Sequence, residues 1–522
     1  MILKKSYRRE HNSSKSLVQL KYLFLFLLSF SFFISNAQQY FPLERGIESS
    51  FNSIFFQKID DFHSNIKPFM EGVASSGCHQ NIDSIKSSIK VSPVVNFGGG
   101  FEMNPKSQFF TNLAIGVGLR GDLKLKSKKL FYNLTYLESY SQYSYYIQNY
   151  IGQTSVVPGQ SYAFKNKNDF YSNRYVDGYL SYSPNEIFNF QLGQGKHFFG
   201  DGYRSLLLSD ASRNYPYLKI STNIWKFRYI NLFTQFKDIT QGLSNAQNKY
   251  GTFHYLSMNL NKSINISLFE SIIWGGRDTL NERNFDVNYL NPIIFYRPVE
   301  FSTGSADNST LGMSTRIKLT NKFMLYGQVV LDEFLLDSLR ARTGWWANKH
   351  GVQGGFKWLN PFGIDDISIT VEHNYMRPYT YTHLRPLENY GHFNQPLAHP
   401  AGANFKELVS ILKYQRNRLS IEAKSVYLNY GADNDTSNYG SNIFLPYTTV
   451  ESINGNFVGQ GIKTHLLHNQ IRGAWLLKPE WNLKAELSVT YRYKKSIVQT
   501  EKNIIIQLGI KTALNNFYDD FF

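Results

Sequence analysis

Apolar and polar residues alternate strictly over long stretches of this chain. From Trp481 to Tyr493, every odd position is apolar or aromatic and every even position is polar or charged. A period of two over that length predicts a long strand with one apolar face and one polar face. The same alternation recurs over residues 130–136, 256–268, 313–331, 471–477 and 504–514, in some cases on both sides of a turn.

The connections between these strands fall into two classes of length. Tight turns are expected at residues 261–263, 320–322 and 478–480, whereas residues 275–307 and 376–404 form much longer connectors. Short turns at one rim and long loops at the other are typical of outer-membrane β-barrels, and abundant Tyr, Phe and Trp suit their aromatic girdles. The sequence therefore predicts an all-β protein with a transmembrane outer-membrane barrel over residues 91–514.

A soluble β-sandwich, propeller or β-helix is the alternative fold. Propellers and solenoids repeat every ~20 to 50 residues, and the sequence shows no such repeat. Sandwich strands are typically about five or six residues long, which is shorter than the alternating stretches here. Both comparisons favour the barrel.

The first 37 residues have the pattern of a secretory signal peptide. Residues 1–21 are basic, residues 22–34 are apolar, and Ser35-Asn36-Ala37 supplies the small residues of a cleavage site. The apolar run is shorter than the ~20 residues that span a bilayer, so cleavage after Ala37 is favoured over an uncleaved membrane anchor. We expect export, and the barrel then predicts localisation in the cell outer membrane.

The chain remains basic after the signal segment is removed, with 49 Lys and Arg against 38 Asp and Glu. An exported basic protein favours anionic partners such as acidic polysaccharide or lipid headgroups, although scattered positive charges also fit a general solvated excess. No basic run or reader motif indicates nucleic acid. Cys78 is the single cysteine, which excludes an internal disulfide and a zinc site built on cysteines.

Two flanking segments differ from the barrel pattern. In residues 38–90, apolar residues recur at helical spacing from Ile47 to Ile66, before Pro68. This spacing predicts an amphipathic helix that plugs the periplasmic mouth, or else an irregular N-terminal arm. Residues 515–522 do not continue the strand alternation, so both a short C-terminal tail and a final strand remain open.

The sequence offers little for catalysis. It contains no phosphate-binding loop, no zinc-protease motif and no nucleophile elbow. His465 and His468 lie three residues apart on one predicted strand and therefore point to opposite faces. We expect no enzymatic activity, no metal site and no cofactor.

Two segments, residues 193–220 and 374–404, interleave cationic and aromatic residues. Aromatic faces offer apolar area to a sugar ring, while Arg and His donate hydrogen bonds to its hydroxyls or carboxylates. The alternative is a loop that folds over the barrel mouth and satisfies its own polar groups. The main glycan candidates are Arg377, Tyr379, Tyr381, His383, Arg385, Tyr390 and His392, and the weaker candidates are Asp201, Tyr203, Arg204 and Arg213.

The stretches GQGKHFFGDGYRSLLLSD and YTYTHLRPLENYGHFNQPLAHPAGANFKE within these segments resemble the Bacteroidetes branch of the Wzi-type capsule-assembly family, and most closely its RemB-like gliding-motility members. The resemblance extends from about residue 61 to the last strand. It implies an outer-membrane barrel of 18 strands, closed on the periplasmic side by a helical N-terminal bundle. It also implies extracellular loops that bind capsular polysaccharide. The chain departs from this pattern in having one helix candidate and in its polar tail after Leu514.

Together these observations lead us to expect an outer-membrane barrel that binds surface polysaccharide in capsule attachment or gliding. Its partners would be the polysaccharide, outer-membrane lipid and proteins of the capsule or motility machinery. Two alternatives remain open: a porin-like solute channel, and a structural subunit of a motility complex without a ligand.

Overall fold

The computed structural model describes residues 40–50, 56, 62–69, 89–104, 107–125, 128–277, 284–293, 307–333, 337 and 340–522. The predicted signal segment, Cys78 and half of the predicted N-terminal helix lie outside these residues. Among the described residues, no helix is both long enough and apolar enough to cross a membrane.

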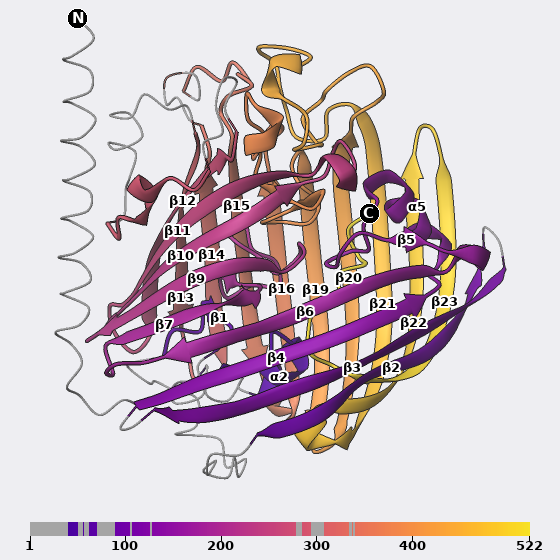
Figure 1. Cartoon of the computed structure of the whole chain (residues 1–522). Helices are drawn as coiled ribbons and strands as arrows, with labels where there is room; N and C mark the ends of the chain where they lie inside the picture. The colour runs from indigo at the N-terminus through magenta and orange to yellow at the C-terminus, as the bar shows by residue number, and fades with distance from the viewer. Residues whose placement is uncertain are drawn as a thin grey trace, which may run out of the picture.

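Eighteen antiparallel strands form a closed barrel, as the sequence predicts (Figure 1). Each strand pairs with its neighbours in chain order, and the first and last strands close the barrel by pairing from Asn96 with Lys511 to Met103 with Ile504. The barrel strands are β2 (Lys90–Met103), β3 (Gln108–Leu125), β4 (Lys128–Ser141), β6 (Tyr171–Tyr182), β7 (Phe188–Gly195), β9 (Tyr215–Ile224), β10 (Phe227–Asp238), β11 (Gln247–Asn259), β12 (Ile264–Gly275), β13 (Asn308–Lys318), β14 (Phe323–Leu331), β15 (His350–Leu359), β16 (Ile367–Met376), β19 (Phe405–Arg416), β20 (Leu419–Ala432), β21 (Ile462–Lys478), β22 (Leu483–Ser496) and β23 (Thr500–Thr512).

Shorter elements lie in the connections and inside the barrel. They are the helices α2 (Arg45–Ser50) and α5 (Tyr145–Thr154), the short strands β1 (Ile66–Lys67), β5 (Phe164–Lys165), β8 (Phe198–Phe199), β17 (Gly391–His392) and β18 (Gln395–Pro396), and the 3-10 turns η1 (Lys167–Asp169), η2 (Leu243–Asn245), η3 (Val287–Leu290), η4 (Pro361–Gly363), η5 (Pro386–Glu388), η6 (Tyr447–Thr449) and η7 (Pro479–Trp481). Helix α5 lies between β4 and β6, where the sequence pattern did not predict a helix.

The strand faces divide as the alternation predicts. On β22, Leu487 and Val489 are 51% and 44% exposed, whereas Thr490 and Arg492 are 2% and 1% exposed. The apolar residues therefore point outward, toward lipid, and the polar residues point into the lumen. His468 is buried in the lumen and His465 contacts Tyr427 on the outer face, so this pair points to opposite faces as expected.

The two rims also differ as predicted. The connectors over residues 275–307 and 376–404 join β12 to β13 and β16 to β19, and the described parts of the long connections lie toward the top of Figure 1. At the other rim, turns as short as Trp225-Lys226 join the strands, here β9 to β10. Short turns face the periplasm in outer-membrane barrels, so the long loops form the extracellular rim.

An apolar core fills much of the lumen. Residues 196–214, between β7 and β9, fold into the barrel and bring Phe199 and Leu206–Leu208 against inward-facing residues such as Tyr255 and Phe269. Phe199 stacks on Tyr255 at a ring separation of 4.5 Å. The side chains that line the β9–β16 side of the barrel therefore pack as they do in a soluble core.

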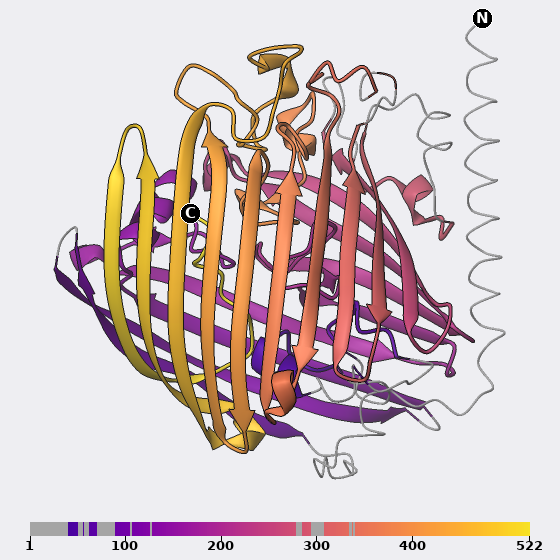
Figure 2. The ribbon, with the colours of Figure 1, turned by 180° about the vertical axis from the view of Figure 1, so that it is seen from behind.

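The two flanking segments also enter the lumen. Ile66 lies in β1 and pairs with Phe199, so the predicted helix does not extend to Ile66, because the backbone there joins a strand instead. Residues 513–522 follow β23 as a tail, with Tyr518, Asp520 and Phe521 buried. Figures 1 and 2 both place this end of the chain within the outline of the barrel.

Candidate functional site

Arg204 is buried inside the barrel between two carboxylates. Its Nη2 lies 2.9 Å from Glu407 Oε1 and 2.7 Å from Asp520 Oδ1. Burial alone lowers the pKa of Arg204, but these carboxylates raise it well above its usual value. The guanidinium therefore stays charged and joins residues 196–214, the barrel wall and the tail.

Neighbours of Arg204 from the same segment are also engaged inside the protein. The backbone N–H groups of Tyr203 and Arg204 donate to the Glu372 carboxylate at 2.7 and 3.0 Å. Asp201 accepts a hydrogen bond from Ser64. Arg213 lies 4.3 Å from the centre of the Phe393 ring. These four weaker glycan candidates brace the lumen and the loop above it, which was the alternative role for this segment.

The tyrosines of the 377–404 loop are fully buried. Tyr379, Tyr381 and Tyr390 donate hydrogen bonds to the backbone carbonyls of Asn438, Leu206 and Leu207, at 2.8, 2.5 and 2.6 Å. The expected exposed stacking surface is therefore absent at these three rings, because each hydroxyl is satisfied inside the loop packing. These three tyrosines hold the loop over the lumen.

The histidines of this loop are buried as well. His383 lies 3.0 Å from Glu388, and the backbone N–H of Lys237 donates to His392 Nδ1 at 3.0 Å. Burial, helped by Arg213 and Lys249, lowers the pKa of His392 to about 3, so this ring is neutral at physiological pH. Neither imidazole is placed to contact a molecule outside the barrel.

The two arginines of the loop are accessible. Arg385 is 38% exposed and lies 3.2 Å from Glu388, while Arg377 is partly buried and donates to the Trp345 carbonyl at 3.2 Å. Of the seven main candidates, these are the side chains that reach the extracellular surface.

Arg377 lies beside a group of partly exposed rings that we call the outer aromatic cluster: Trp345, Trp346 and Tyr447. The rings of Trp346 and Tyr447 are 4.8 Å apart. The buried Lys349 ammonium lies 4.4 Å from the Tyr447 ring and 5.2 Å from the Trp346 ring. This cluster was not predicted from the sequence, although the adjacent tryptophans were an available signal.

Two loops hold the outer aromatic cluster in place. The backbone N–H groups of Gly455 and Asn456 donate to the carbonyls of Thr343 and Gly344, each at 2.8 Å. A Cβ at Gly344 would lie 2.8 Å from the Asn456 nitrogen, and its φ is +66°, so this close approach needs glycine. The rings therefore sit on a joined surface of residues 340–349 and 433–461.

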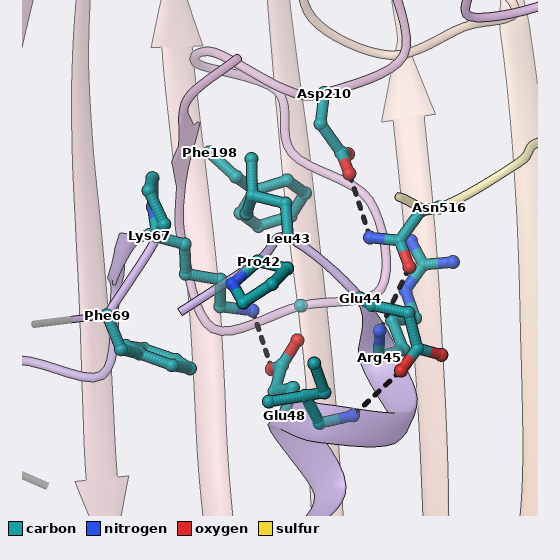
Figure 3. Close-up of a pocket in the computed structure, with 13 residues that line it drawn as sticks. Pro42, Leu43, Glu44, Arg45, Glu48, Lys67, Phe69, Phe198, Asp210 and Asn516 are labelled. Carbon is teal, nitrogen blue, oxygen red and sulfur yellow. Dashed lines mark hydrogen bonds and ion pairs between the residues drawn. The ribbon is translucent and has the colours of Figure 1, made fainter. Parts of the chain in front are cut away.

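A second charged cluster lies at the N-terminal segment inside the barrel (Figure 3). Lys67 Nζ lies 2.6 Å from Glu48, and Asn516 links the Arg45 backbone at 3.0 Å to the Asp210 carboxylate at 2.8 Å. The cavity among these residues is about 20 Å³, which is the size of a single water. This cluster clamps three parts of the chain together and has no room for a sugar.

This clamp predicts an acid-sensitive structure. Burial alone raises the pKa of Glu48, but Lys67 and Lys357 lower it to about 2, from 4.5. A lowered carboxylate pKa stabilises the fold above pH 4.5, and the stabilisation is lost as pH falls toward 2. We expect the thermal unfolding temperature in detergent to fall across this window, and to fall less steeply in Glu48→Gln.

The matched control is Asp366→Asn, which removes an exposed carboxylate 3.7 Å from Arg416. Its unfolding temperature should follow that of the unchanged protein at every pH, because exposed pairs contribute little. A Glu48→Gln variant with the same acid slope as the unchanged protein would contradict this assignment.

Within the part of the chain that the structure describes, no three His, Cys, Asp or Glu residues are arranged to hold a metal ion.

No known family profile and no curated protein matches this chain. Among solved structures it is similar to Wzi of Escherichia coli, with a TM-score of 0.56 and 12% identity over 91% of this chain and 100% of that chain. Wzi is described as an outer-membrane protein involved in group 1 capsule assembly and as a carbohydrate-binding β-barrel. OccK7 of Pseudomonas aeruginosa follows at a TM-score of 0.41 and 10% identity, over 81% of this chain and 98% of that chain. At these identities the likeness shows the barrel fold alone.

Proposed function

We propose that this protein is a non-enzymatic outer-membrane barrel that holds polysaccharide at the cell surface. The supporting observation is the outer aromatic cluster, whose rings lie on the extracellular loops, with Arg377 in contact with Trp345. Partly exposed rings bind the apolar face of a sugar, and arginine binds its carboxylates or hydroxyls. The buried loop residues Tyr379, Tyr381, His383, Tyr390 and His392 hold this surface rigid.

The biological setting of this proposal rests on two likenesses. The fold is similar to that of Wzi, which is described as carbohydrate-binding. The loop sequences resemble the Bacteroidetes branch of the Wzi-type family, and most closely its RemB-like members. We therefore place the polysaccharide in capsule attachment or in gliding, with capsule or motility proteins as partners. The arginines favour an acidic polysaccharide.

The test is retention of the cell's own surface polysaccharide by the purified protein held in detergent. Replacing both Trp345 and Trp346 by Ala is expected to weaken retention by roughly tenfold or more, since aromatic contacts contribute about 0.5–1.5 kcal/mol each. Added salt should weaken retention further, because charged contacts at an exposed surface are screened.

The matched control is Trp481→Ala, which removes the same ring from η7 at the opposite rim and should leave retention unchanged. Equal retention by the double variant would exclude the outer aromatic cluster as the binding surface. No retention by the unchanged protein would overturn the proposal and favour a structural subunit, which predicts stable protein partners instead.

A further inference from the structure

A cavity of about 360 Å³ lies on the side of the lumen opposite the apolar core. Its lining begins at the short-turn rim with Lys484, Lys511 and Thr512, and it ends beneath α5 at Ser144 and Ile147. The cavity therefore follows the barrel wall over most of its height. Lumenal space of this kind is what distinguishes a conducting barrel from a filled one.

The tail, residues 513–522, forms one side of this cavity. Asn516 and Tyr518 donate to the Asp210 carboxylate at 2.8 and 2.5 Å, and Asp520 lies 2.7 Å from both Arg204 and Lys424. These contacts hold the tail in place along the lumen. The tail thus occupies space that would otherwise be continuous with the cavity.

The last residues of the tail reach the outer closure of the lumen. Arg492 donates to the Phe522 backbone oxygen from Nε at 3.1 Å and from Nη2 at 2.6 Å. The Phe522 ring packs against Tyr150 and Tyr146 of α5, at 4.4 and 5.5 Å between ring centres. The tail therefore contributes to the packing of α5 over the cavity, together with wall residues such as Phe110 and Ile505.

The barrel wall beside the tail is basic. Its cavity-lining charges are the cations Lys413, Lys424, Arg472, Lys484 and Lys511 and the acids Glu422 and Glu486. Lys413 and Arg472 donate hydrogen bonds to neutral oxygens, those of Ser49 at 2.6 Å and Gln470 at 2.8 Å. The adjoining wall, β2 to β4, carries small neutral residues, including Gly98, Gly99, Asn112, Ser139 and Ser141. The tail supplies Asp519 and Asp520, so its departure leaves the lumen more positive.

We propose that the lumen is a conduit for small hydrophilic anions that the C-terminal tail keeps closed. The tail closes it in two ways: it fills the space beside the cavity, and it seats α5 through Phe522. Once the tail is out, Lys424 loses Asp520 and joins Lys413 and Arg472 along the cavity, while Arg204 keeps its ion pair with Glu407. Rings of Lys and Arg select anions in membrane pores. This function is separate from glycan retention at the outer surface.

The test is conductance of the purified protein in planar lipid bilayers under a KCl gradient. The unchanged protein should conduct little, and a variant ending at Thr512 should conduct at least tenfold more. Its reversal potential should shift toward the chloride equilibrium potential. Asp365→Asn, in the turn before β16, removes an acid outside the lumen and should behave as the unchanged protein does.

A second variant keeps the test decisive if the shortened chain does not fold. Asp520→Asn with Phe522→Ala keeps the full length but removes one charge and one ring that hold the tail, while Asn516 and Tyr518 stay on Asp210, and it should open to a smaller conductance with the same anion preference. Circular dichroism verifies that each variant retains its strands. A folded variant that stays closed, or an open pore that prefers potassium, would overturn the proposal.

Discussion

Replacing Arg204 with Met is expected to destabilise the folded barrel by about 3–5 kcal/mol, because it removes the buried guanidinium that two buried carboxylates share. Glu407 and Asp520 are fully buried, and the arginine lies where the tail meets the barrel wall. Lys424 would still neutralise Asp520, at 2.7 Å, but His399 is then the remaining basic group on Glu407. Equilibrium unfolding by guanidinium in detergent measures the change.

Arg174→Met is the matched control for this substitution. Arg174 lies 3.2 Å from Glu138, and the two side chains are 75% and 55% exposed. Exposed ion pairs contribute about 0–1 kcal/mol, so this variant should unfold almost as the unchanged protein does. Equal losses in the two variants would show that Arg204 does not hold the lumen together.

The strands could be predicted because successive side chains of a strand point to opposite faces, so apolar and polar residues alternate along the sequence. Leu487, Val489 and Tyr491 face lipid and Ser488, Thr490 and Arg492 face the lumen for the same reason that they alternate in sequence. The turns followed from where the alternation broke. Trp481 is an exception to this alternation. The pattern predicts that it begins the strand, but it lies in η7, and β22 begins only after Asn482, whose backbone is left-handed with φ of 48°.

The lumenal packing was not predictable from the same pattern. Arg204 finds Glu407 and Asp520, which are separated from it by 203 and 316 residues. A segment rich in Arg, Asp and Tyr has the same composition whether it binds a sugar or braces the inside of a barrel. The tail gave no local signal either, since its partner Asp210 belongs to residues 196–214.

The candidate site was half predictable for a related reason. Composition pointed to the loop of residues 374–404, and Arg377 and Arg385 do reach its surface. Composition does not show which aromatic rings a loop buries to hold its shape, so Tyr381 and Tyr390 were misplaced on the outside. The rings that are accessible, Trp346 and Tyr447, come from other loops and meet only in the fold.

Val489→Arg is expected to destabilise the barrel by about 2–4 kcal/mol, which is the cost of a cation on the lipid face near the bilayer midplane. Val489 is 44% exposed, points outward and lies near the middle of β22. Val489 does not pack in the lumen, so the loss of stability measures only the cost of placing the cation in the membrane. Unfolding in liposomes measures it, because detergent lets the arginine reach water more easily.

Ile497→Arg supplies the comparison, since Ile497 is 86% exposed in the turn that joins β22 to β23 at the extracellular rim. A cation there stays in water, and its cost should be about 0–1 kcal/mol. The difference between these substitutions measures the depth of β22 in the bilayer. Equal costs would mean that the apolar outer face of this strand does not meet lipid, and the assignment of the strands as membrane-spanning would fail.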